Sequence, residues 1–539
     1  MKARLFAIAP VLLLAACTKP APSAPPAPPV AAAAAASAPR VQGIAWTFAA
    51  NDAQVDAAFA QARSENKPVF VYWGAKWCPP CNQVKATLFN RIDFIERSRA
   101  FVPIYIDGDS PGAQKLGTRF KVRGYPTMVL FSPQGAELTR LPGEVDAAQI
   151  TRVLTLGMDA RRPVKAVLAD ATRGGAGLAA NDWKLLAFYS WETDEQQLVD
   201  KAHLPMLLKR LAAACPKDQA DTAGRLLLQA LAAAGDEHPA HLADAAARTR
   251  LEQLLADADA ARRQMDVLTN NAADIVRAAS HAGTAPRTQL LAAFDAALRR
   301  LQADATLSRA DRLTALQARV ELARIDQPKD SKAPPPPLPA SLLAEVREQA
   351  ARMDHDITDG YERQAVITEA AYLLAEAGLL DESDALLQAN LSKSHSPYYL
   401  MSELASNARK RGDAAAALSW SKQAFEQAEG PATRLQWGAG YIKTLVDLAP
   451  TDEAAIETTA QQLFDEAGAQ PNAFYERNAR SLQRAGGALA AWNKAQAHHA
   501  AMQRLQARLH DVCARLPAAD QAQRTVCEGL LSPPAAKGA

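Results

Sequence analysis

Two cysteines separated by two prolines, Cys78 and Cys81, are the residues of this 539-residue chain whose types and spacing point most directly to chemistry. They follow an apolar run at 69–73 and precede a segment with helical periodicity at 82–88, so both thiols are expected at a helix N-terminus. The positive end of the helix dipole favours a thiolate there, which allows Cys78 to attack a disulfide. Cys81, one helical turn later, can then attack the mixed disulfide and close the pair. The spacing predicts thiol–disulfide exchange with Cys78 and Cys81 as the catalytic residues.

A Cys-x-x-Cys pair can also be half of a zinc site, which needs two further cysteine or histidine ligands nearby. The sequence has no such residue at a suitable spacing, and its first histidine is His203. We therefore expect no metal at Cys78 and Cys81. No motif for another cofactor stands out either.

The residues around the pair affect how well a Cys78 thiolate would be stabilised. Pro79 and Pro80 make the turn rigid but carry no N–H, so they offer the thiolate no hydrogen bond. Lys76 could lower the pKa of Cys78 electrostatically, although a solvated loop lysine is an equally good interpretation.

The N-terminus has the pattern of a secretory signal. Lys2 and Arg4 precede an apolar stretch at 5–16 that is shorter than the ~20 residues needed to span a bilayer. The stretch ends in Leu14-Ala15-Ala16-Cys17, which resembles the lipobox of bacterial lipoproteins and implies residues 1–17 as a signal peptide with lipid attached to Cys17. The alternative is an ordinary signal peptide with an incidental cysteine.

The compartment follows from this segment and the next. Thr18 stands where the inner-membrane retention signal of enteric lipoproteins would have Asp, so family analogy favours the outer membrane of a Gram-negative bacterium. Residues 18–40 are nearly all Pro, Ala and Ser, a composition that predicts an extended tether. We expect a periplasm-facing protein with a membrane anchor, in a compartment where disulfides persist.

Two regions of different composition follow the tether. Of the 32 aromatic residues, 14 lie within 41–160 and only five within 165–335. Strand-like runs, at 69–73, 101–106 and 127–131, also stop near residue 160. They alternate with helical segments such as 55–64, for which Asp52 is a candidate N-cap. This alternation predicts an α/β domain over 41–160.

Beyond residue 165 apolar residues recur three and four positions apart, which predicts an all-α region. A proline-rich linker at 327–340 divides it into lobes at 165–326 and 341–539. The tryptophans of this region could line a partner groove or, more commonly, the core; they are Trp183, Trp191, Trp420, Trp437 and Trp492. The net charge of +2 without long charged runs gives nucleic-acid binding no support.

Part of the second lobe resembles tetratricopeptide repeats. Gly378 and Gly412 are 34 residues apart, and Ala417-Leu418, Trp420 and Ala424-Phe425 match the small and large positions of a repeat. Asp384 and Asn390 depart from that pattern, so a generic array of helical hairpins remains the alternative.

Residues 43–157 resemble a thioredoxin-fold domain. The resemblance rests on the segment Trp77 to Cys81 and on Val122-Arg123-Gly124-Tyr125-Pro126-Thr127. The segments Ile44-Ala45-Trp46 and Asn66-Lys67-Pro68-Val69 look most like the periplasmic thioredoxin-like domains of bacterial disulfide-reducing systems. The resemblance implies that Pro126 is cis and that Trp77, Tyr125 and Pro126 bind the substrate strand. One departure is Tyr72, which stands where the family buries an acidic residue that accepts the proton of the resolving thiol. A phenol is a poor base at neutral pH, although it could relay a hydrogen bond.

The other cysteines are assigned to structural roles. Cys513 and Cys527 flank a turn at 516–520 and are expected to form a disulfide, which would stabilise the chain by about 3 kcal/mol. Two separately buried thiols are the alternative. Cys215 follows an alanine-rich apolar segment and is expected to be a buried core residue.

The sequence thus predicts a thiol–disulfide oxidoreductase. Its partners would be protein thiols and disulfides and a redox partner protein, with the helical region recruiting or positioning a partner. Whether it reduces, oxidises or isomerises disulfides depends on its reduction potential. The rival hypothesis is a helical-repeat interaction scaffold in which the α/β domain docks partners or senses redox state.

Overall fold

The computed structural model describes residues 43–539 except for 123, 142, 144–145, 161, 195–196, 236–243, 328–335 and 533–539. The predicted signal peptide with Cys17 and the tether lie outside the described residues, as does most of the predicted linker at 327–340. In the part of the chain that is described, no helix combines the length and apolar character needed to cross a membrane. Residues Gln42–Ala539 form one compact unit.

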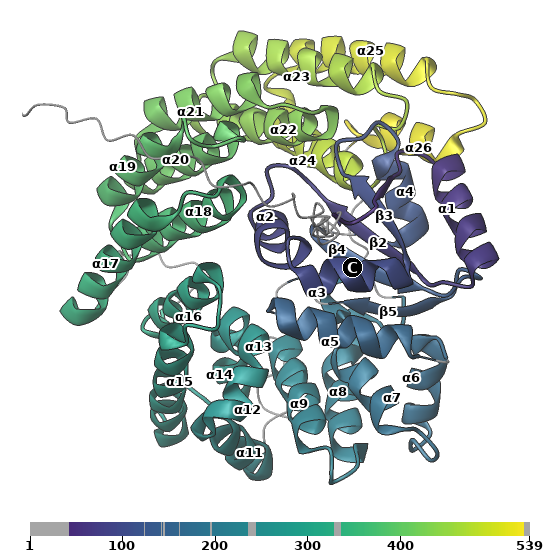
Figure 1. Ribbon diagram of the computed structural model, residues 1–539. Coiled ribbons are helices and arrows are strands. Elements are labelled where there is room, and N and C mark those ends of the chain that lie inside the picture. Colours follow the sequence, from purple (N-terminus) through teal and green to yellow (C-terminus); the bar gives the residue numbers. More distant parts are fainter. Residues whose placement is uncertain are drawn as a thin grey trace, which may run out of the picture. The chain divides into compact units, whose positions relative to one another are not determined.

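Five strands form one mixed sheet in the order β1-β3-β2-β4-β5. Figure 1 labels β2 to β5 of this sheet. β3 is parallel to β1 and β2, whereas β4 is antiparallel to β2 and β5. The strands are β1 Thr47–Phe48, β2 Val69–Gly74, β3 Val102–Asp107, β4 Thr127–Phe131 and β5 Glu137–Leu141. The predicted α/β fold is confirmed, and β2, β3 and β4 correspond to the three strands expected from the sequence.

The sheet is covered on both faces because its central strand is apolar throughout. Every residue of β2 is buried. Val71 and Trp73 face one cluster, which contains side chains of α1 (Asp52–Glu65) and α4 (Ala113–Phe120). Phe70 and Tyr72 face the other, which contains side chains of α2 (Pro79–Val84), α3 (Ile92–Arg97) and α5 (Ala147–Met158). The alternation of side chains along β2 thus builds two cores with the sheet between them.

One predicted cap is wrong by a residue. Helix α1 begins at Asp52, but Asn51 is its N-cap, and the Asn51 side chain accepts a hydrogen bond from the Gln54 backbone N–H at 3.0 Å. Asn51 has extended backbone angles, as an N-cap requires, whereas Asp52 is already the first helical residue.

The rest of the described chain is helical, as predicted. The helices before residue 327 are α6 Val164–Thr172, α7 Ala180–Ala187, α8 Leu204–Ala214, α9 Ala220–Ala234, α11 Ala245–Ala256, α12 Ala258–Arg263, α13 Met265–Asn270, α14 Ala272–Ala279, α15 Ala285–Ala303 and α16 Arg309–Leu322. Those after residue 339 are α17 Ala340–Asp356, α18 Gly360–Glu376, α19 Leu380–Asn390, α20 Pro397–Arg411, α21 Ala414–Gln427, α22 Pro431–Leu448, α23 Glu453–Gly468, α24 Glu476–Trp492, α25 His499–Ala514 and α26 Gln521–Gly529. We call these two groups the first and second helical groups.

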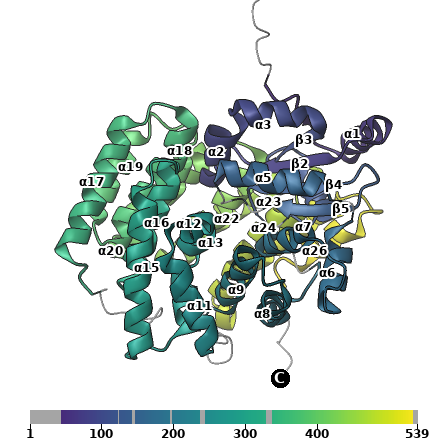
Figure 2. The same ribbon diagram turned by 60° about the horizontal axis from the view of Figure 1, so that its bottom comes forward.

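Both helical groups contact the α/β part. Helix α18 packs on α2, and α24 packs on α4, whereas α7 of the first group packs on α5. Figure 2 shows α18 beside α2 and α5 over β4 and β5 from a second direction. The turn that carries Cys78 therefore lies next to the second helical group.

Two hairpins of the second group turn at glycines. Gly378, between α18 and α19, and Gly412, between α20 and α21, have φ of 89° and 77°, a region that favours glycine. The two polar residues that depart from the repeat pattern make hydrogen bonds. The Asn390 amide donates one to the Asp354 carboxylate, and the Asp384 carboxylate accepts one from the Asn407 amide. Hydrogen bonds thus satisfy polar groups at positions that the repeat family fills with apolar or small residues.

Candidate active site

The two cysteines lie where β2 ends and α2 begins. Cys78 is the N-cap of α2, and its Sγ accepts a hydrogen bond from the Cys81 backbone N–H at 3.2 Å. The two Sγ atoms are bonded, with 5.2 Å between the Cα atoms. Helical structure continues from α2 through a π-helical turn at Lys85–Phe89, so the pair lies at the N-terminus of an extended helical segment. This position can stabilise a Cys78 thiolate once the bond is reduced.

A buried amide holds the turn in place. Asn82 is fully buried, and its Nδ2 donates to the carbonyl oxygens of Lys76 and Cys78, each at 2.8 Å. Pro79 and Pro80 occupy the first helical positions, which leaves the Cys81 N–H as the donor to Sγ of Cys78. Sequence reasoning missed Asn82, although a polar residue directly after the second cysteine was the available signal.

The predicted substrate-binding loop lies against the same turn. The Tyr125–Pro126 peptide bond is cis, as the resemblance implied. The Tyr125 hydroxyl accepts a hydrogen bond from Nε2 of Gln114 at 3.0 Å, and burial raises the pKa of Tyr125. Its ring centroid lies 6.3 Å from that of Trp77. The structure therefore brings Trp77, Cys78, Cys81 and Tyr125 together.

The surroundings of Tyr72 support the expectation that it is a poor base at neutral pH. Its hydroxyl is buried and has no hydrogen-bond partner among the described residues. Burial raises its pKa well above the ordinary value, because the charged phenolate would lose its hydration. Nor does Lys76 present an isolated charge to Cys78, since its Nζ lies 3.0 Å from a carboxylate oxygen of Glu429.

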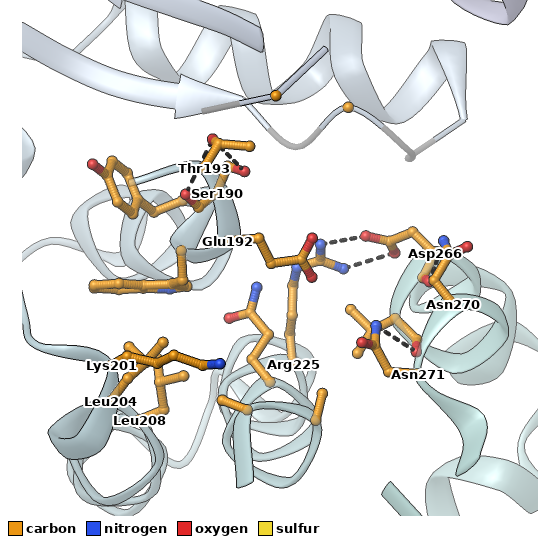
Figure 3. Close-up of a pocket in the computed structure, with 18 of the residues that line it drawn as sticks. Ser190, Glu192, Thr193, Lys201, Leu204, Leu208, Arg225, Asp266, Asn270 and Asn271 are labelled. Carbon is orange, nitrogen blue, oxygen red and sulfur yellow. Dashed lines mark hydrogen bonds and ion pairs between the residues drawn. The ribbon is translucent and has the colours of Figure 1, made fainter. Parts of the chain in front are cut away.

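A cavity of about 500 Å³ with both polar and apolar lining residues adjoins the Tyr125–Pro126 loop (Figure 3). Residues 124–126 and Gly143 line one side, and the other lining residues lie between 189 and 271. Arg225 and Asp266 form a buried ion pair there, with two hydrogen bonds. Burial also raises the pKa of Glu192, which lies near this pair in Figure 3. The volume is within the range of ligand sites, roughly 300–1,000 Å³.

A smaller cavity of about 140 Å³ touches Pro79 and Pro80. Glu369 of α18 lines it, and burial raises the pKa of this carboxyl to about 7. Gln83 contributes to the same cavity and donates a hydrogen bond to Asp311 of α16 at 2.8 Å. The helical region therefore contributes polar groups beside the cysteine turn that the sequence alone did not reveal.

The helical region also covers the cysteines. Cys78 is 2% exposed and Cys81 is 0% exposed. Both belong to an apolar cluster that includes residues of α20, α21 and α22, namely Tyr398, Met401, Ala424, Phe425 and Trp437. Trp437 was one of the tryptophans considered for a partner groove, and here it packs against the predicted active site.

The remaining cysteines lie apart from this site. Cys513 and Cys527 are bonded to each other between α25 and α26, with 5.8 Å between their Cα atoms. Cys215 is a buried free thiol, and burial raises its pKa to about 11.

Comparison with known proteins places the similarity in the α/β part. Residues 55–157 match the family described as thioredoxin-like domain. Thiol:disulfide interchange protein DsbD 1 of Pseudomonas aeruginosa is 32% identical over 113 residues, which are 20% of this chain and 19% of that protein. Thioredoxin-like protein slr0233 of Synechocystis is 35% identical over 88 residues, 16% of this chain and 79% of that protein. The chain thus matches about a fifth of DsbD 1 but most of the cyanobacterial protein.

Proposed function

Because the chain belongs to the thioredoxin-like family, we propose that it is a thiol–disulfide oxidoreductase in which Cys78 attacks and Cys81 resolves. The observation that carries this proposal is the placement of the bonded Cys78–Cys81 pair at the start of α2, beside the cis Tyr125–Pro126 bond. By family resemblance, Trp77, Tyr125 and Pro126 bind the substrate strand.

The proposed reaction transfers two electrons from the reduced pair to a substrate disulfide. The Cys78 thiolate attacks one substrate sulfur, and the other leaves as a thiolate that takes up a proton. Cys81 then loses its proton and attacks Sγ of Cys78. This step breaks the mixed disulfide, releases the second substrate thiol and forms the Cys78–Cys81 bond present in the structure. A redox partner protein must reduce that bond again, and the reverse sequence oxidises a dithiol.

The test of this proposal is the replacement Cys78→Ser. We expect the full chain to catalyse reduction of insulin disulfides by a thiol donor and the Cys78→Ser variant to lose this catalysis. A Cys215→Ser variant controls for the loss of a thiol, because Cys215 is buried away from the pair. Equal rates for wild type and Cys78→Ser would contradict the assignment.

We place the protein at the periplasmic face of the outer membrane, with lipid on Cys17. The charged start, apolar run and Leu-Ala-Ala-Cys ending of the sequence support this proposal. Expression with radiolabelled palmitate tests it: wild type should incorporate label and partition with membranes, and Cys17→Ala should do neither. Labelling of Cys17→Ala at the wild-type level would exclude Cys17 as the attachment site.

A second candidate function is a redox-sensing scaffold, and one observation favours it. The cysteine pair is buried under the second helical group, so its oxidation state could control how that group packs. A scaffold of this kind predicts different partner retention by oxidised and reduced protein without catalytic turnover. Multiple turnovers of insulin per molecule would favour the enzyme instead.

A further inference from the structure

The surface that a substrate disulfide must reach is occupied by the chain's own second helical group. Trp77 precedes the proposed nucleophile and packs against two neighbouring rings of that group, Tyr399 and Trp437. Its ring is stacked on Tyr399 of α20, with centroids 5.8 Å apart and planes inclined by 17°. The Trp437 ring of α22 meets it edge-on at 5.2 Å. These two rings fill the space next to Trp77 that a substrate would otherwise occupy.

A positively charged side chain of the second helical group, Arg477, also lies against Trp77. The guanidinium carbon of Arg477, at the start of α24, lies 4.7 Å from the Trp77 ring centroid and 5.0 Å from that of Tyr125. Trp77 and Tyr125 are two of the three residues proposed to bind substrate. A single side chain of the helical region thus contacts both, in a geometry that favours a cation over an aromatic face.

Hydrogen bonds also join the α/β part to α22 and α24 of the second helical group. Asp109, after β3, accepts hydrogen bonds from the backbone N–H and the hydroxyl of Thr433 in α22, both at 2.7 Å. Gln114 accepts from the Arg477 backbone N–H at 3.1 Å. Thr118 of α4 donates to Glu476 at 2.9 Å. These hydrogen bonds add to the apolar cluster that joins the cysteine turn to the second helical group.

In the part of the chain that the structure describes, too little of Cys78 is exposed for a protein disulfide to react with it. An attacking or attacked sulfur must approach Sγ of Cys78, yet Cys78 is 2% exposed. Neither the cavity of about 500 Å³ nor that of about 140 Å³ is lined by Cys78 or Cys81. A polypeptide substrate therefore cannot reach the sulfur unless the cover moves.

We propose that α20, α22 and the start of α24 form a cover over the redox pair, which must separate from the α/β domain before a protein disulfide can react. This inference rests on the proposed oxidoreductase function. Activity towards proteins then equals the activity of the open state multiplied by the fraction of molecules that are open. A contact that stabilises the covered state lowers activity, and its removal raises activity.

The structure offers a site for a covalent lock. A Cβ placed on Gly117 of α4 would lie 3.5 Å from Cβ of Glu476. This separation is within the range of roughly 3.5–4.5 Å found in disulfides. The double variant Gly117→Cys/Glu476→Cys therefore presents two thiols that can be bridged across the cover. Neither position belongs to the proposed catalytic or substrate-binding residues.

The experiment uses the full chain carrying Cys215→Ser. The lock cysteines are bridged irreversibly with dibromobimane while the Cys78–Cys81 pair is still oxidised and therefore protected. We expect the bridged protein to reduce insulin at least tenfold more slowly than the same double variant without the bridge.

Arg477→Ala, which removes the cation from both rings, should instead raise the insulin rate severalfold. Arg508→Ala is the matched control, because Arg508 of α25 pairs with Asp465 of α23 and is not among the residues that contact the described part of the α/β domain.

The outcomes separate this inference from the function on which it rests. Equal insulin rates for bridged and unbridged protein would overturn the cover and leave the oxidoreductase intact. If neither the unbridged protein nor Arg477→Ala reduces insulin, the oxidoreductase proposal fails and the cover fails with it.

Alkylation of reduced Cys78 by iodoacetamide gives a readout independent of insulin. It should be slower in the bridged protein and faster in Arg477→Ala, and equal labelling rates would also overturn the cover.

Discussion

The Trp77 ring, one residue before Cys78, packs edge-on against the Trp437 ring at a centroid distance of 5.2 Å, although 360 positions separate the two residues in sequence. This contact joins the segment with the redox motif to the helical region. It is one of several contacts that hold the α/β and helical parts in one compact unit.

The first prediction concerns which cysteine attacks. In Cys81→Ser the resolving thiol is absent, so a mixed disulfide between Cys78 and insulin should accumulate. Non-reducing gel electrophoresis followed by mass spectrometry of the linked peptide measures it. Cys78→Ser is the matched control and should trap no substrate. A complex linked through Cys81 in Cys78→Ser would reverse the assigned roles.

The second prediction concerns Asn82. Replacing Asn82 with Ala removes two hydrogen bonds and leaves the carbonyls of Lys76 and Cys78 without those donors. We expect the free energy of unfolding to fall by about 1–3 kcal/mol. Because the turn also fixes Sγ of Cys78, the pH dependence of Cys78 alkylation should shift as well. A loss of stability with an unchanged alkylation profile would limit Asn82 to a structural role.

The third prediction concerns pH. Burial raises the pKa of Asp109 to about 6, whereas an unfolded aspartate titrates near ~3.9. The folded state therefore holds this proton more tightly, and its contribution to stability is complete below pH ~4 and is lost as pH rises through about 6. Asp107 and Arg477 are the charged groups acting on it, and Thr433 is its hydrogen-bond partner.

The measurement for Asp109 compares wild type with Asp109→Asn, which cannot ionise. From pH 4 to pH 7, wild type should lose on the order of 2 kcal/mol of stability relative to the variant. Thermal unfolding midpoints across this range give the comparison. Parallel curves for the two proteins would contradict the raised pKa.

The fourth prediction concerns the second disulfide. Replacing both Cys513 and Cys527 with Ser should lower the free energy of unfolding by about 3 kcal/mol, because the unfolded chain loses a cross-link. Insulin reduction should be unaffected, since this bond lies apart from the Cys78–Cys81 cluster. Stability equal to that of wild type would mean that the bond is absent in solution.

The sequence predicted the α/β fold well because its signals are local. A buried strand such as β2 and the spacing of Cys78 and Cys81 are visible in a few neighbouring residues. The strand β1 is only two residues long, and it did not stand out by composition. The Asn51 cap was missed by one position because adjacent Asn and Asp are both good caps.

The cover could not be predicted in the same way. Tyr399, Trp437 and Arg477 are each ordinary residues of amphipathic helices, and their patterns do not show which surface they face. Their contacts with Trp77 join segments more than 300 residues apart. Helical periodicity identifies a buried face but not the element that buries it.

We propose that Cys78 and Cys81 exchange two electrons with a protein disulfide. The most direct test reacts the reduced full chain with insulin in a single turnover and counts thiols on each protein by alkylation and mass spectrometry. The account predicts that Cys78 and Cys81 lose two thiols as insulin gains two, with Cys215 unchanged. Insulin that gains no thiols while the pair stays reduced would contradict it.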